Sequence, residues 1–254
     1  MAGIRTLLAA SAIFAALSPA AWAAGELPPL KSMDWPHAGP FGTFDRASLQ
    51  RGFQVYTEVC AACHSLKYLH FRQLEGIGLS AEEIKAVAAG FEVVDGPNED
   101  GDMFERDGKP ADRLPQPFEN DQQARAANAG ALPPDLSLIV KSRKGHENYV
   151  YSLMTGYGTA PAGMQMREGM NYNAYFPGHQ IAMPPPLSED GVEYSDGTKA
   201  TVDQMAYDVT NFLAWAASPK LENRKKMGLK VMIFLAVFTG LLIAVKKKVW
   251  SDVH

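Results

Sequence analysis

Cysteine is scarce in this sequence: its 254 residues contain only Cys60 and Cys63, both within the stretch EVCAACHSLKYLH. A compact structural zinc site needs further ligands at similar spacing, and there is no other cysteine to supply them. A thioredoxin-like redox pair stands at the start of a helix, after a strand, whereas this pair follows a predicted helix. Neither chemistry fits the pair well.

Strand patterns and internal repeats are also missing, which argues against a sheet-based fold. Helical signals are present instead. Asp45 can cap a helix that runs to about Val59. Ser80 and Glu83 match the S-x-x-E capping box of a second helix, which Gly90 can end.

Two more helices are predicted in the second half of the chain. Helical signals run from about residue 146 to 157, and the clearest helix covers 202–217. Thr201 and Gln204 match a T-x-x-Q capping box at its start. Residues 91–134 are turn-rich and acidic, which indicates a structured surface insertion.

Long apolar runs occur only near the two ends. Residues 7–17 follow a basic start and precede the small-x-small site Ala21-Trp22-Ala23. Because this run is too short to span a bilayer, we expect a secretory signal peptide over 1–23 rather than a retained anchor. Residues 227–245 contain one charge, and as a helix they would extend about 28 Å, close to the thickness of the hydrocarbon core. They predict a transmembrane helix.

The flanks of this span divide the rest of the chain. Residues 220–226 form a basic linker, and the tail 246–254 carries three lysines and Trp250, which suit a cytoplasmic end. Residues 24–219 are short of basic side chains, with 15 Lys and Arg against 26 Asp and Glu, whereas residues 220–254 have 8 against 2. An acidic head can attract a basic soluble partner, or it can simply keep an exported domain soluble.

The order C-x-x-C-H predicts covalent haem. Two thiols at this spacing add to the vinyl groups of a haem, and the following histidine, His64, becomes the proximal ligand of the iron. Attachment of this kind takes place outside the cytoplasm, in agreement with the predicted signal peptide.

The second axial ligand decides the function class. An open position permits peroxide or small-molecule chemistry, whereas a thioether closes the site and leaves electron transfer. The candidate ligands are Met103, Met154, Met164, Met166, Met170, Met183 and Met205, together with His70, His146 and His179. Met205 and Met154 belong to helix stripes and are expected in the core. Met183 is the strongest candidate because three prolines follow it and restrict the backbone that presents its sulfur.

Several segments in order resemble the cytochrome c1 family, the membrane-anchored haem subunits of cytochrome bc1 complexes. They are RGFQVYTEVCAACHSLKYLHFRQL, DGPNEDGDMF, ARAANAGALPPDLSLI, ENYVYSLMTGY, YFPGHQIAMPPPL and WAASP with RKKMGLKVMIFL. The resemblance covers essentially the whole mature chain. It implies thioether links at Cys60 and Cys63, axial ligation by His64 and Met183, and a haem propionate facing Arg125. Some bacterial relatives carry an extra cysteine pair that is absent here.

The resemblance implies an all-α fold: an enlarged class I cytochrome c-like domain with long loop insertions, on one C-terminal membrane helix. It implies one haem c. The predicted signal peptide and C-terminal span favour a bacterial inner membrane, with the haem domain over 24–219 in the periplasm. The implied function is that of an oxidoreductase subunit that accepts electrons from a Rieske iron-sulfur protein and passes them to a cytochrome c. Its other implied partner is cytochrome b, in a dimeric complex without nucleic acid. The alternatives are a tethered c-type subunit of another respiratory complex, and a haem peroxidase or gas sensor.

Overall fold

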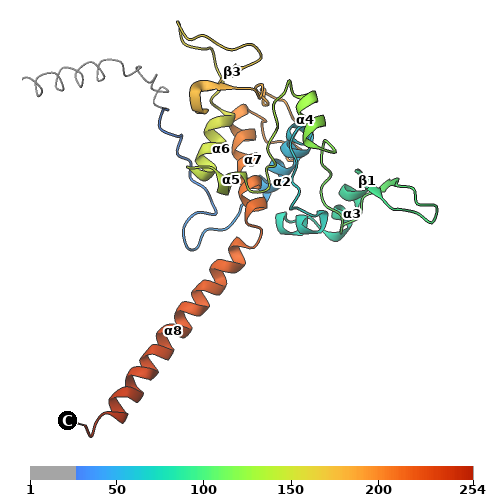
Figure 1. Ribbon diagram of the computed structural model, residues 1–254. Coiled ribbons are helices and arrows are strands. Elements are labelled where there is room, and N and C mark those ends of the chain that lie inside the picture. Colours follow the sequence, from blue (N-terminus) through green and yellow to red (C-terminus); the bar gives the residue numbers. More distant parts are fainter. Residues whose placement is uncertain (1–26, 254) are drawn as a thin grey trace, which may run out of the picture.

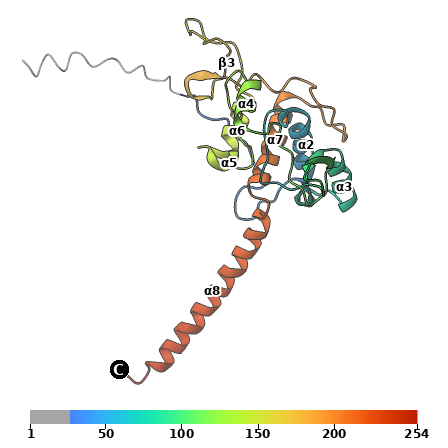
Figure 2. The ribbon, with the colours of Figure 1, turned by 45° about the vertical axis from the view of Figure 1, so that its right-hand side comes forward.

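The computed structural model describes residues 27–253, so the predicted signal peptide lies outside the described residues. A helical head stands on one long helix, α8, which leaves the head and ends near the C-terminus (Figures 1 and 2). The head contains α2 (Arg46–Val55), α3 (Ala81–Ala89), α4 (Asp121–Ala127), α5 (Ile139–Ser142), α6 (His146–Met154) and α7 (Val202–Ala217). Short 3-10 segments cover Phe71–Ile77 and Pro177–His179. The all-α prediction is confirmed.

Strands are few within residues 27–253. They form two small antiparallel hairpins, β1 (Glu92–Asp95) with β2 (Phe104–Asp107), and β3 (Asn171–Tyr172) with β4 (Gln180–Ile181). The predicted surface insertion over 91–134 therefore holds the first hairpin and α4. Arg106 bridges Asp95 and Asp112 at the base of that hairpin and holds the pKa of Asp112 at about 2.

The core of the head is the packing of α2 against α7. Asp45 caps α2 by accepting hydrogen bonds from the backbone amides of Ala47 and Ser48. Gly52 allows the close approach of the two helices, because a Cβ at this position would lie 2.0 Å from the carbonyl oxygen of Asp208. Leu49 and Phe212 are among the large side chains that are fully buried around this contact.

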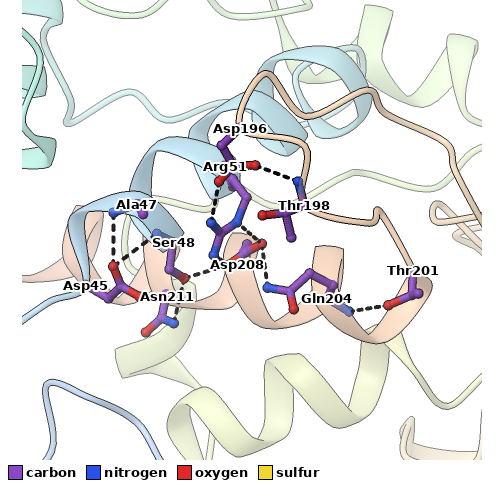
Figure 3. A network of polar contacts seen from close by, with 10 residues as sticks. All are labelled: Asp45, Ala47, Ser48, Arg51, Asp196, Thr198, Thr201, Gln204, Asp208 and Asn211. Carbon is purple, nitrogen blue, oxygen red and sulfur yellow. Dashed lines mark hydrogen bonds and ion pairs between the residues drawn. The ribbon is translucent and has the colours of Figure 1, made fainter.

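A polar network crosses the same interface (Figure 3). Asp208 of α7 is completely buried and accepts hydrogen bonds from Ser48 Oγ at 2.7 Å and from Arg51 Nε at 2.8 Å. Arg51 also reaches Asp196 at 2.7 Å, and these two carboxylates raise the pKa of its guanidinium above the usual value. A buried charge is tolerated only when its hydrogen-bonding capacity is used, and here four donor atoms converge on Asp208.

One of the two predicted capping boxes forms only in part. Thr201 accepts a hydrogen bond from the Gln204 amide as expected, but the Gln204 side chain turns away to bond Asp208 at 2.9 Å. The second half of the T-x-x-Q box was therefore wrong, since the buried carboxylate competes for the same amide group. The Ser80 and Glu83 box forms reciprocally, as predicted.

The membrane helix is longer than its apolar part. α8 runs without a break over Leu221–Val249, so the basic segment expected as a linker forms its first turns. α8 is the one helix within the described residues that is long and apolar enough to cross a membrane, and its most apolar window is fully exposed.

Candidate functional site

The cysteine motif begins where α2 changes its winding. The helix continues past Val55 as a π-helical turn, Tyr56–Cys60, in which the Ala61 amide donates to the Tyr56 carbonyl at 2.8 Å. Such wide turns often occur at functional sites, because they redirect the residues that follow. The sequence predicted a helix up to the cysteines but did not show the change of winding.

The chain then folds tightly around the Cys60 carbonyl. This oxygen accepts hydrogen bonds from the amides of Cys63 at 3.1 Å and His64 at 2.8 Å. Both cysteines are free thiols, Cys60 half-buried and Cys63 exposed. Burial, and to a lesser degree the neighbouring Cys63, raises the pKa of the Cys60 thiol to about 12.

His64 is oriented by one hydrogen bond. Its Nδ1 lies 2.8 Å from the carbonyl oxygen of Pro134. A carbonyl can only accept, so Nδ1 carries the hydrogen and Nε2 keeps a free lone pair. This is the arrangement that metal-binding histidines show in proteins. Burial lowers the pKa of His64, against opposing effects of Pro134 and Asp135, and so favours the neutral ring that a metal needs.

A second segment, residues 134–137, holds the motif in place, and the sequence did not predict this role. Asp135 accepts hydrogen bonds from Ser65 Oγ at 2.8 Å and from the Lys67 amide at 2.9 Å. Burial acts to raise the pKa of Asp135, but these hydrogen bonds bring it below its usual value. The Leu136 amide donates to the Ser65 carbonyl at 2.8 Å. The available signal was Pro-Pro-Asp-Leu-Ser, since Asp followed by Ser after prolines is typical of a side-chain-stabilised turn.

Met183 lies two residues after the end of β4, half-buried, with Pro184 following it. Its carbonyl accepts a hydrogen bond from Tyr157 Oη at 3.1 Å. Burial raises the pKa of Tyr157 above the usual range, so the phenol stays protonated and able to donate. Within residues 27–253 no hydrogen bond joins Met183 to the segment Cys60–His64, so each half of the candidate site is anchored separately.

The other candidate ligands occupy different environments. His70 begins a 3-10 segment and takes part in its cap with Gln73. The Nδ1 atoms of His146 and His179 lie 3.1 and 3.0 Å from backbone carbonyl oxygens. Met205 is fully buried, and Met154 packs on the same core. Three methionines of the 160–170 loop are half-buried, and Met103 is 61% exposed on the first hairpin.

Arg125 lies in the last turn of α4 and is exposed. Its Nη1 donates to the Gly130 carbonyl at 3.0 Å, and no described carboxylate pairs with it. Its remaining donors could therefore bind a carboxylate of a bound group.

The donor set agrees with covalent haem. Two unpaired thiols stand at the ends of one turn, and the adjacent imidazole has an anchored Nδ1 and a free Nε2. Among the described residues there is no cluster of three or more His, Cys, Asp and Glu side chains of the kind that holds a metal by itself. A zinc site is therefore no better supported by the structure than by the sequence.

Comparison with known proteins supports the same interpretation. The profile of the Cytochrome C1 family matches residues 35–253. The chain is 46% identical to Cytochrome c1 of Rhodospirillum rubrum over 98% of both chains. It is 54% identical to Cytochrome c1 2, heme protein, mitochondrial, of Arabidopsis thaliana over 80% of this chain, although the match spans 66% of that protein.

A third relative is a longer protein, Cytochrome b/c1 of Bradyrhizobium diazoefficiens, which is 49% identical over 87% of this chain and 35% of its own length. The family model and the Rhodospirillum rubrum relative together match nearly all of the described chain. The chain therefore belongs to the cytochrome c1 family, whose members carry a covalently bound haem c.

Proposed function

We propose that this protein is an electron-transfer subunit in which Cys60 and Cys63 hold one haem c, and His64 and Met183 are the axial ligands. When bound, the haem supplies reversible one-electron chemistry. The observation that carries the proposal is the His64 hydrogen bond, because it leaves Nε2 free beside two thiols. Arg125 would neutralise a haem propionate.

The chain's residues hold these groups in place. Tyr56 Oη donates to the His64 carbonyl at 3.0 Å while Asp135 ties the following residues to the 134–137 segment. Tyr157 holds the backbone of Met183. Because these hydrogen bonds fix the residues that would hold the haem, they would limit the movement of the protein when an electron is gained or lost.

We further propose the place of the chain in a membrane complex. The name of the Bradyrhizobium relative joins a cytochrome b to c1, and this supports cytochrome b as a partner in a bc1 complex. We propose separately that the complex is dimeric. Within it the chain would take electrons from a Rieske iron-sulfur protein and pass them to a soluble cytochrome c. The resemblance of the whole chain supports these roles, and the exposed apolar face of α8 would pack against cytochrome b.

The proposed orientation follows from the sequence at both ends. The signal peptide 1–23 would export the haem domain 24–219 to the periplasm. Residues 227–245 would cross the bacterial inner membrane as the apolar part of α8, leaving 246–254 in the cytoplasm. Purification from native membranes tests the assignment. We expect cytochrome b and a Rieske protein to co-purify with quinol-dependent cytochrome c reduction, whereas co-purification with a haem-copper oxidase would show the alternative complex.

Replacing Tyr157 by Phe tests the support of Met183. The variant loses one hydrogen bond to the Met183 carbonyl, worth about 1 kcal/mol. We expect the haem to remain attached, with the charge-transfer band of methionine ligation disappearing at a lower temperature or lower pH than in the unaltered protein. Tyr175→Phe is a matched control, since the Tyr175 phenol has no hydrogen bond within the described residues. Equal behaviour of both variants would show that Tyr157 does not support the ligand.

The β1–β2 hairpin is proposed to dock a basic cytochrome c. Its tip carries the exposed Glu99, Asp100 and Asp102, whereas Asp95 is engaged by Arg106. Neutralising the three tip carboxylates as amides should slow association about tenfold at low ionic strength, and flatten its dependence on salt, because steering weakens. Stopped-flow mixing with a basic cytochrome c measures both quantities.

The control for the hairpin variant must remove equal charge elsewhere on the head. Glu75, Glu82 and Glu168 are exposed and lie outside the hairpin, so their triple Gln variant has the same net charge. If the two variants slow association equally, total charge rather than the hairpin would determine the rate.

A further inference from the structure

A cavity of about 300 Å³ lies where the head meets α8. Its wall combines the loop before α2, α5, the start of α6, the end of α7 and the start of α8. The lining includes the ionisable side chains of His37, Lys141, His146, Glu147 and Lys225, together with Ala217. Figure 1 shows this junction as the point where α7 leads into α8 below the head.

The cavity wall has an excess of positive charge with unused donors. Lys225 Nζ donates to the carbonyls of His37 at 2.6 Å and Gly42 at 2.9 Å, and Lys141 Nζ donates to the Ala217 carbonyl. An ammonium has three N–H groups, so at least one donor on each lysine remains available. Within residues 27–253 neither lysine lies within 4.0 Å of a carboxylate. Both charges are therefore uncompensated.

His37 contributes a buried polar atom without a partner. The side chain is 7% exposed, and its Nε2 lies 3.1 Å from Glu147 Oε1. Its Nδ1 has no hydrogen-bond partner among the described residues. Because a buried polar atom without a partner is destabilising, a bound group that supplies a hydroxyl would satisfy it. Glu147 adds one negative charge to the wall, but its carboxylate is occupied by His37.

The position of the cavity along α8 determines which ligand can reach it. Lys225 lies two residues before the apolar segment that begins at Met227, which is about 3 Å along a helix axis. The headgroup layer on each side of the hydrocarbon core is about 5–8 Å thick. The cavity is therefore at the level of the lipid headgroups on the side of the head.

We propose that this cavity binds the headgroup of an anionic phospholipid of the phosphatidylglycerol type. Lys141 and Lys225 bind the phosphate, and a glycerol hydroxyl donates to His37 Nδ1. The acyl chains then lie along the exposed apolar side of α8. This site joins the head to the membrane surface and does not depend on the proposed redox partners.

A photoreactive lipid tests the proposal. The full-length holoprotein is placed in nanodiscs that contain phosphatidylglycerol with a diazirine on its headgroup, and labelled peptides are mapped by mass spectrometry. We expect label in peptides covering residues 35–42 and 214–225. Labelling of the peptide containing residues 246–254 serves as an internal reference, because its lysines also attract anionic lipid from the other leaflet.

Double variants of Lys141 and Lys225 test whether these two lysines are needed for labelling at the cavity. Lys141→Gln with Lys225→Gln should reduce labelling at the cavity by about tenfold or more, the effect of losing a charge-assisted hydrogen bond. The Lys141→Arg with Lys225→Arg variant should retain it. Lys85 and Lys199 are exposed and have no described carboxylate partner, so Lys85→Gln with Lys199→Gln is the charge-matched control and should label normally.

Several outcomes would overturn the proposal. One is equal labelling of the Gln variant, and another is equal labelling by a phosphatidylcholine probe. The lipid comparison uses the unaltered protein, so it remains decisive if the Gln variant does not accumulate. Suppression of the label by millimolar inorganic phosphate would assign the cavity to free phosphate rather than to lipid.

Discussion

Met183→Leu is expected to leave the haem covalently attached while removing its proposed second axial ligand. Leucine has nearly the volume of methionine but offers no sulfur, so packing of the half-buried site changes little. The charge-transfer band of methionine ligation should disappear in the ferric protein. The midpoint potential should fall by a few hundred millivolts, within the roughly 0.8 V range over which axial ligands set haem potentials.

The functional consequence is the loss of the proposed activity. A lower potential makes the chain a poor acceptor, since for one electron each 59 mV is a factor of about ten in equilibrium constant. Quinol-dependent reduction of cytochrome c by the complex should become undetectable. The open position should then bind carbon monoxide, which is the property of the rival sensor or peroxidase class.

The chain provides its own controls for this experiment. Met164, Met166 and Met170 lie half-buried in one loop, and Met103 is exposed on the hairpin. The corresponding Leu variants should keep the band and the potential. If one of them lost the band while Met183→Leu kept it, the assignment of the axial ligand would be wrong. If the unaltered protein already bound carbon monoxide, the sensor class would be favoured.

Asp208→Ala is expected to destabilise the head by about 3–5 kcal/mol, the usual cost of removing one partner of a buried ion pair. The side chain is fully buried and accepts from Ser48, Arg51 and Gln204. Its removal leaves the Arg51 guanidinium with only Asp196 and leaves the Ser48 hydroxyl without its acceptor. Urea denaturation of the oxidised holoprotein measures the loss.

A surface ion pair is the control. Arg46 and Glu222 lie 2.8 Å apart, with the Arg46 side chain 43% exposed. Arg46→Gln should cost less than about 1 kcal/mol. A similar small effect for Asp208→Ala would show that water reaches the network and that the helix pair does not depend on it.

Asp208→Ala should also affect the haem site. Because α2 leads through Tyr56–Cys60 into the cysteine motif, loosening of the α2 and α7 contact should reach Cys60. Asp208→Ala should therefore reduce the yield of attached haem, whereas Arg46→Gln should not.

The sequence alone was sufficient for features that depend on local chemistry. The Asp45 and Ser80 caps, the burial of Met205 and the apolar span of α8 are properties of neighbouring residues, and the structure confirms them. The C-x-x-C-H order indicated covalent haem for the same reason, since its spacing reflects the size of the cofactor. The match of the chain to the cytochrome c1 family agrees with this prediction of covalent haem.

The remaining features depend on residues far apart in the chain. The tautomer of His64 is decided by Pro134, 70 positions later, and the Met183 backbone is held by Tyr157, 26 positions earlier. Gln204 left its predicted cap because Asp208 became buried against α2. Local sequence patterns describe what a residue prefers, but the hydrogen-bond partner of a buried group is decided by which segments the fold brings to it. For this chain, the sequence determined the haem motif, the helices α2, α3, α6 and α7 and the membrane span, and only the tertiary structure decided how His64 and Met183 are held.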